Sequence, residues 1–189
     1  MSTPSGFHLT DACTEAHFTD MSLLHALGWR TAYRDFIPED YMRREITDGR
    51  WTPVFRENDQ TGRYHGLVLY RGARPVCCAT YGPARTGSFS AGETVCDLWS
   101  PDLADWGELV SLYCHPEERG KGYGSLVLRE VLERLSGAGR PGCLLFVLRE
   151  NEGARRFYAR HGFAWDGTQV DVPIPPDTVL TDLRYTRKF

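Results

Sequence analysis

The 189-residue sequence has no apolar run of the roughly 18–20 residues that a helix needs to cross a bilayer. Its first six residues are polar and lack the basic and apolar regions of a signal peptide. The formal net charge is -3, so the chain also lacks the basic excess with which nucleic-acid and anionic-membrane binders neutralise phosphates. These absences predict a cytoplasmic protein that binds neither nucleic acid nor membranes. They do not exclude a local basic pocket.

Paired cysteines are also missing. The six cysteines are scattered and none belongs to a CxxC pair, which removes the usual spacing of a zinc site. We therefore expect no metal site, and we expect reduced thiols that are mostly small core residues. The cysteines are Cys13, Cys77, Cys78, Cys96, Cys114 and Cys143.

The composition that remains is ordinary for a globular protein, with 41% hydrophobic and 25% charged residues, and the length suits one domain over residues 1–189. Stretches with helical apolar spacing lie between strand-like stretches, which predicts a mixed α/β fold without repeats. The expected strands are 7–11, a hairpin over 66–81, 107–116, 143–148, 163–173 and 179–188. The expected helices are 15–33, 37–48, 122–135 and 151–160.

One connection is unusually long. Residues 82–105 are rich in Gly, Ser and Pro and show no clear period. Ordinary connections are about 4–6 residues long, so a segment of this length is either functional or poorly ordered.

The stretch "HPEERGKGYGSLVL" (115–128) places glycines directly before an apolar, helix-like run. A strand that leads through a glycine turn into a helix N-terminus makes an anion site, because free amides and the helix dipole favour negative charge. Arg119 and Lys121 would add cationic side chains, which points to a phosphate or pyrophosphate ligand. A plain glycine turn is the alternative. The P-loop pattern fails because Gly122 follows Lys121, and the Rossmann GxGxxG pattern fails as well.

The turn resembles the pyrophosphate loop of the GCN5-related N-acetyltransferase (GNAT) family, [RQ]xxGxG, which Arg119, Gly122 and Gly124 match. A second block, "NEGARRFYARHGF" (151–163), is similar to that family's Asn, Ala, Phe-Tyr, Gly-Phe pattern. "GWRTAYRDFIPEDYM" (28–42) resembles the paired substrate-side helices of many bacterial members. The resemblance is strong over about 107–165 and looser elsewhere.

The resemblance implies a central, mostly antiparallel sheet of about six to seven strands flanked by about four helices. It also implies acetyl-CoA as co-substrate, with its pyrophosphate on the loop amides and its pantetheine arm on the preceding strand. Asn151 would contact the coenzyme, cap its helix, or do both. The implied coenzyme-binding residues are Leu112, Tyr113, Cys114, Arg119, Gly120, Lys121, Gly122, Tyr123, Gly124, Ser125 and Asn151.

Acetyl transfer from a thioester to an amine needs a neutral amine and a proton for the departing thiolate. By its motif position Tyr158 is the general acid, and an aromatic core contact is the alternative. Glu108, eleven residues before Arg119, matches the base of histone-acetylating members, acting directly or through water; a solvated strand-end charge is the alternative. We interpret Cys114 as a strand residue rather than an acyl carrier, and His115 as structural.

We therefore predict an N-acetyltransferase that moves an acetyl group directly to a primary amine in a ternary complex. The amine is small and cationic, or belongs to a protein or peptide. A non-catalytic acyl-CoA-binding protein is the alternative, and a nucleotide enzyme is disfavoured by the failed motifs. Homodimerisation is left open.

Acidic residues favour a cationic acceptor: Glu39, Asp40 and Glu45 lie on the substrate-side helix and Glu93 and Asp97 in the long connection. With Phe89 and Trp99, that connection suits a position over the acceptor site. A disordered insertion or a dimer contact is the alternative.

Overall fold

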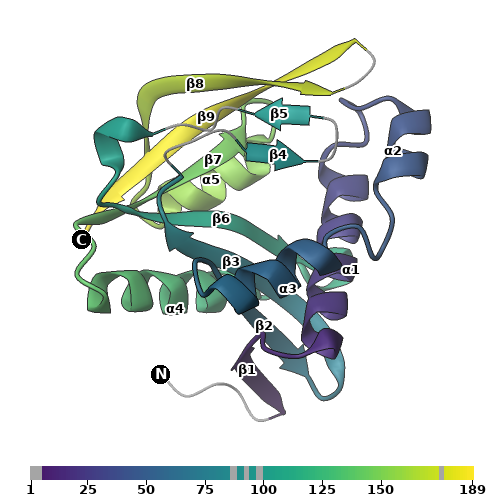
Figure 1. Cartoon of the computed structure of the whole chain (residues 1–189), viewed down its shortest axis with the longest axis horizontal. Coiled ribbons are helices and arrows are strands. Elements are labelled where there is room, and N and C mark those ends of the chain that lie inside the picture. The colour runs from purple at the N-terminus through teal and green to yellow at the C-terminus, as the bar shows by residue number, and fades with distance from the viewer. Residues whose placement is uncertain (1–5, 86–88, 92–93, 97–99, 175–176) are drawn as a thin grey trace.

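The protein is described here from a computed structural model that covers residues 6–85, 89–91, 94–96, 100–174 and 177–189, with only the backbone for 89–91, 94–96 and 101. A seven-stranded sheet crosses the molecule in the order β1-β2-β3-β6-β7-β9-β8 (Figure 1). Its strands are β1 (Phe7–Asp11), β2 (His65–Arg71), β3 (Arg74–Pro83), β6 (Gly107–Cys114), β7 (Gly142–Leu148), β8 (Ala164–Ile174) and β9 (Thr178–Lys188). All neighbours pair antiparallel except β6 and β7. The predicted mixed α/β fold with a mostly antiparallel sheet is confirmed.

Five α-helices flank this sheet within the described residues, one more than expected. The unpredicted helix α3 buries only Phe55, so its apolar period is too weak to detect, although Pro53 opens its first turn and Gly62 closes it in the left-handed conformation. The helices are α1 (Glu15–Ala32), α2 (Glu39–Glu45), α3 (Thr52–Thr61), α4 (Tyr123–Gly137) and α5 (Glu152–Arg160). No described helix is long and apolar enough to cross a membrane.

The two faces of the sheet carry different helices. Helix α4 buries a stripe that includes Val127, Val131 and Leu135 in the largest core cluster, to which α5 contributes Tyr158. Helices α1 and α3 cover the other face, where Met21 and Phe55 share a cluster with Val68. Both faces of the central strands are therefore buried, which explains the continuous apolar runs of β3 and β7.

Strands β6 and β7 pair over a short distance only. The parallel register joins Gly107 to Cys143 and Glu108 to Leu144, and no further pair follows within the described strands. Beyond Glu108 the two strands diverge, so the backbone of β6 on that side is left without a strand partner. This opening in the middle of the sheet positions the site described below.

Helix α1 crosses close to β6. A Cβ atom at Gly28 would lie 2.2 Å from Cδ1 of Tyr113, so only glycine allows this approach.

The long connection contains more regular structure than expected. Strand β3 extends to Pro83, and β4 (Phe89–Ala91) pairs with β5 (Thr94–Cys96) as a hairpin ahead of a short 3-10 helix at Pro101–Leu103. This hairpin pairs within itself rather than with the main sheet, and the sequence of the connection, which shows no clear period, did not predict it. The side chains of Phe89, Glu93, Asp97 and Trp99 lie outside the described residues.

Candidate active site

The glycine turn has the backbone that its sequence predicts. Gly120 and Gly122 have φ angles of 76° and 86°, which side-chain-bearing residues rarely adopt, and α4 begins directly after Gly122. Among the described residues, no partner accepts a hydrogen bond from the amides of residues 120–123. These amides lie at the positive end of the α4 dipole, so the turn is built to receive an anion.

A cavity of about 820 Å³, here called the coenzyme cavity, opens beside this turn between the C-terminal end of α1, the start of α4 and α5. Ten of the eleven residues assigned to the coenzyme line it: Leu112, Tyr113, Cys114, Arg119, Gly120, Gly122, Tyr123, Gly124, Ser125 and Asn151. Lys121 does not, because its ammonium group lies 2.8 Å from Oε2 of Glu118. Glu118 is only 2% exposed and also binds Arg71, so it turns Lys121 away from the anion site.

Asn151 lies where it can both cap α5 and contact the coenzyme. Its Oδ1 accepts a hydrogen bond from the amide of Ala154 at 3.1 Å and so caps α5. The same residue lines the coenzyme cavity.

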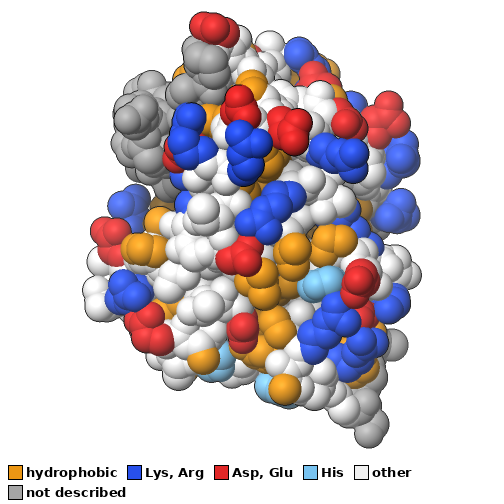
Figure 2. All heavy atoms as spheres, turned by 90° about the vertical axis from the view of Figure 1, so that its right-hand side faces the viewer, with side chains coloured by type: hydrophobic (Ala, Val, Ile, Leu, Met, Phe, Trp, Pro, Cys, Tyr) orange, Lys and Arg blue, Asp and Glu red, His pale blue; other side chains and the backbone are white. Residues whose placement is uncertain are grey.

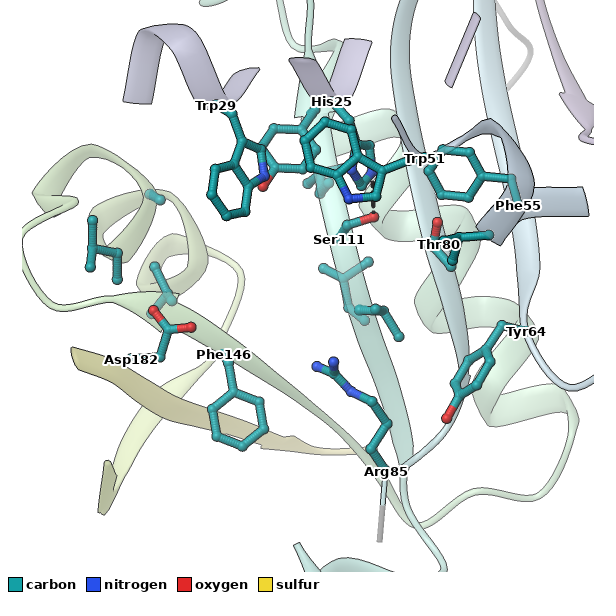
Figure 3. Close-up of a pocket in the computed structure, with 18 of the residues that line it drawn as sticks. His25, Trp29, Trp51, Phe55, Tyr64, Thr80, Arg85, Ser111, Phe146 and Asp182 are labelled. Atoms are coloured by element: carbon teal, nitrogen blue, oxygen red, sulfur yellow. Dashed lines mark hydrogen bonds between the residues drawn. The ribbon is translucent and has the colours of Figure 1, made fainter. Parts of the chain in front are cut away.

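A second cavity, of about 410 Å³, lies on the other side of β6 and is here called the acceptor cavity. Figure 3 shows Trp29, Trp51 and His25 along one end, Tyr64 and Asp182 on opposite sides, and Arg85 entering from the other end. Eight of its lining residues are Phe, Trp or Tyr, and none of the three acidic residues of α2 contributes to the walls. Asp40 and Glu45 of α2 form ion pairs with neighbouring arginines instead.

The two cavities meet at Tyr158. Five residues line both of them, namely Leu112, Tyr113, Asn151, Ala154 and Tyr158. Tyr158 is 8% exposed and stands against Phe157 and Phe163, while no described residue hydrogen-bonds to its hydroxyl. Burial raises the pKa of Tyr158, so the phenol keeps its proton at neutral pH.

Glu108 differs from both expectations for it. The carboxylate is 0% exposed, so it is not a solvated strand-end charge. It also binds the guanidinium group of Arg85 through Nε at 2.8 Å and through Nη2, and it accepts the backbone amide of Arg85 at 2.8 Å. Arg85, not Glu108, lines the acceptor cavity.

Asp182 is a site residue that the sequence did not reveal. It lies on β9 opposite Leu148 and lines the acceptor cavity, and no described residue forms a hydrogen bond or ion pair with its carboxylate. Burial raises the pKa of Asp182 to about 6, against a smaller opposing effect of Arg85. Aspartate is depleted in strands, so its place in the long β9 strand was the one available signal.

His25 and Ser111 form a polar pair in the same cavity. Nε2 of His25 lies 2.9 Å from Oγ of Ser111, and Nδ1 of the histidine has no described partner. Burial lowers the pKa of His25 to about 3, so the ring is neutral at physiological pH.

Cys114 and His115 follow the predicted structural roles. Sγ of Cys114 lies 3.1 Å from Sγ of Cys77 on the neighbouring strand. His115 accepts the amide of Glu117 through Nδ1 and thereby shapes the turn before the glycines. Among the described residues no group of three or more His, Cys, Asp or Glu side chains is placed to hold a metal ion.

The face of the molecule that carries α1 and α2 combines apolar and charged surface. Figure 2 shows a strip of hydrophobic side chains on this face, with basic side chains beside acidic ones. The ion pairs Arg74–Glu117 and Lys121–Glu118 are examples of such neighbours near the glycine turn.

Similar folds occur in known acetyltransferases. PaiA N-acetyltransferase from Thermoplasma acidophilum, solved in complex with coenzyme A, superposes with a TM-score of 0.71 at 16% identity, covering 97% of this chain and 99% of that one. Ribosomal-protein-alanine N-acetyltransferase from Brucella melitensis gives 0.68 at 18% identity, covering 96% and 99%. An N-acetyltransferase from Staphylococcus aureus Mu50 gives 0.66 at 17% identity, covering 97% and 99%. No curated relative matches the sequence.

The sequence itself matches the acetyltransferase (GNAT) family over residues 27–163, which is more than two thirds of the chain. The match includes the glycine turn, strands β6 and β7, helix α5 and the residues after it up to Phe163. The chain belongs to the acetyltransferase (GNAT) family and is an acetyl-CoA-dependent acyltransferase.

Proposed function

We propose that this protein transfers the acetyl group of acetyl-CoA directly to a primary amine while both substrates are bound. The observation that carries the proposal is the meeting of two cavities at Tyr158, one beside an anion-binding turn and one with aromatic walls. Direct transfer needs the two substrates to enter from separate sides and to meet at one point. A covalent acyl-enzyme is not required.

The coenzyme cavity suits acetyl-CoA in both its charge and its length. The free amides of residues 120–123 would take the pyrophosphate, and Arg119 would add a positive charge at the rim. The unpaired edge of β6 at Leu112–Cys114 leads from this turn toward Tyr158 and offers backbone groups to the pantetheine arm. The thioester would then lie at the opening between β6 and β7.

In the proposed reaction the neutral amine attacks the thioester carbonyl, a C–N bond forms, the C–S bond breaks, and the departing thiolate takes the proton of Tyr158. The acetylated nitrogen loses one proton to solvent, and Tyr158 regains its proton from solvent. The buried phenol is protonated and stands where the cavities join, which suits this role. Glu108 enters the proposal as the residue that holds Arg85 in place. As a base it would first have to leave its two-pronged contact with that arginine.

The proposal is tested by binding and turnover measured separately. Calorimetry with acetyl-CoA should show binding, with ATP as the negative control. A panel of primary amines should then give acetylated products, detected by mass rather than by thiol release, because the protein carries six cysteines of its own. Binding of acetyl-CoA without product from any amine would favour the non-catalytic acyl-CoA-binding alternative. The cytoplasmic location and homodimerisation stay predictions.

A further inference from the structure

The carboxylate of Asp182 faces the acceptor cavity without a partner. Side chains two residues apart on a strand share a face, so Asp182 lies on the same face of β9 as Arg184. Arg184 does not neutralise it, because Arg184 is held by Asp102 at 2.8 Å and by Asp166 at 2.7 Å. Figure 3 shows Asp182 beside Phe146 at the cavity wall.

Asp182 also dominates the charge of this cavity. The other charged residues in its lining are Arg63 and Arg85. Arg85 is compensated by the buried carboxylate of Glu108, and Arg63 is exposed at the rim, where its guanidinium carbon lies 5.4 Å from the Tyr64 ring. Asp182 is the single carboxylate that lines the cavity among the described residues, so the deep part of the cavity attracts a cation.

The rest of the lining is largely aromatic and aliphatic, with His25, Asn58, Thr80, Ser111 and Asn151 as its uncharged polar side chains. The Trp29 ring is tilted against that of Trp51 with centroids 5.6 Å apart, and against that of Tyr33 with centroids 4.7 Å apart. Phe55 and Phe146 complete the lining from other elements. Aromatic faces suit an aromatic or aliphatic body and attract a cation.

We propose that Asp182 binds the ammonium group of the acceptor and removes its proton, and that the acceptor is a small primary amine with an aromatic or aliphatic body and no carboxylate beside the amine. This inference rests on the proposed amine acetylation and names its base and its substrate class. A carboxylate next to the amine would lie against the carboxylate of Asp182, which disfavours amino acids.

The ammonium group first gives one proton to the carboxylate of Asp182. The neutral amine then forms the C–N bond with the acetyl carbon, the C–S bond breaks, and the thiolate leaves with the proton of Tyr158. The second amine proton, which is acidic once the nitrogen is bonded to the acetyl carbon, passes to solvent. The products are the N-acetyl amine and coenzyme A, and the tyrosine regains its proton from solvent.

The pH dependence of this step follows from the groups around Asp182. Arg85 from the connection after β3 opposes protonation, and Glu150 after β7 favours it. Tyr33 directly after α1 and Tyr113 of β6 act on the same carboxylate, and burial raises the pKa of both tyrosines, so they stay neutral. His25 has a pKa lowered to about 3 and does not titrate near neutral pH. The acid limb of kcat/KM should therefore fall near the pKa of Asp182, at about pH 6.

The test uses the full chain, acetyl-CoA and phenethylamine as the probe amine. Asp182→Asn should lower kcat/KM about 100- to 10,000-fold, as for loss of a general base, and remove the acid limb near pH 6. Asp182→Glu should restore part of the rate with a shifted limb. Asp171→Asn is the matched control: Asp171 lies on neighbouring β8, bonds to Thr181 and does not line the cavity, so it should keep the wild-type profile. All variants should bind acetyl-CoA with unchanged affinity.

The substrate class is tested in the same assay. Phenethylamine should exceed both phenylalanine and spermidine in kcat/KM by at least about tenfold, since a site that leaves a charge unpaired discriminates strongly. A preference for phenylalanine or spermidine overturns the class. A folded Asp182→Asn variant that keeps its rate within threefold and its acid limb overturns the base.

If wild-type protein binds acetyl-CoA but acetylates no amine, the proposed function fails and the inference fails with it. That failure shows in the wild-type protein, whereas failure of the inference alone shows only in the Asp182 variants or in the order of the amines.

Discussion

The coenzyme cavity and the acceptor cavity differ in what forms their walls. The coenzyme cavity comes mostly from two continuous stretches, residues 112–125 and 150–160, and its anion site consists of backbone amides. The acceptor cavity collects side chains from α1, α3, β3, β6, β7, α5, β9 and several connecting segments. A backbone site requires a conformation, which short glycine motifs encode. A side-chain site requires particular residues at distant positions, and no local motif encodes those.

This comparison predicts that the two cavities respond to different substitutions. Side-chain changes around the acceptor cavity should alter turnover or stability and leave acetyl-CoA affinity unchanged. Backbone changes in the glycine turn should weaken acetyl-CoA binding and leave the acceptor cavity unchanged.

The largest effect is expected at Glu108, whose ion pair with Arg85 anchors one end of the acceptor cavity. Glu108→Gln removes the buried carboxylate charge that pairs with the Arg85 guanidinium and should cost about 3–5 kcal/mol of unfolding free energy. For a chain of this size that lowers Tm by at least about 6 °C. Glu117→Gln removes an exposed partner of Arg74 and should change Tm little. A Glu108→Gln variant with wild-type Tm but no acid limb in its pH–rate profile would return Glu108 to the role of base.

The next effect is expected at Tyr158, where the cavities meet. Tyr158→Phe should lower kcat by about 10- to 1,000-fold, as for loss of a general acid, while the acetyl-CoA dissociation constant stays within about twofold. Stopped-flow or mass-detected turnover and calorimetry measure the two quantities. Wild-type turnover across pH 6–9 would leave Tyr158 as a packing residue only.

A smaller effect is expected in the glycine turn. Gly122→Val should weaken acetyl-CoA binding by about tenfold or more, because the left-handed φ of 86° strains any residue with a branched Cβ. Gly124 has no such φ, and a Cβ there would meet Cys114 and Phe157 at an ordinary 3.4 Å, so Gly124→Ala is the matched milder variant. Equal losses at both positions would show that the conformation of the turn is not what binds the anion.

The smallest effect concerns stability at Asp182. Its pKa is raised from 3.8 to about 6, so the folded protein holds this proton more tightly than the unfolded chain does. The unfolding free energy therefore falls as pH rises through that window, and the loss persists above it. Asp182→Asn should raise Tm by about 2–5 °C at pH 8. The gain should vanish below about pH 4, which differential scanning calorimetry at both pH values checks.

The seven strands of the main sheet, four of the helices and the part of the coenzyme cavity around the glycine turn could be predicted from the sequence, because periodic burial and glycine motifs are local properties. The sequence did not predict α3, which buries only Phe55. It also placed Lys121 in the anion site, although Glu118, only three residues earlier, holds its ammonium group. The contact of Glu108 with Arg85 joins residues 23 positions apart, so no local pattern reveals it. Asp182 reaches the acceptor cavity through the pairing of β9 with β7, a long-range register that no single stretch reveals.

The close approach at Gly28 has a consequence for how this enzyme can be altered. Tyr113, which a Cβ atom at position 28 would strike, forms part of both cavities, so helix α1 cannot move away from β6 without changing the space for both substrates. Substitutions on this face of α1 should therefore shift the KM values of acetyl-CoA and amine together. Re-engineering the enzyme for larger amines is better begun at Phe146 or Tyr64, which line the acceptor cavity alone.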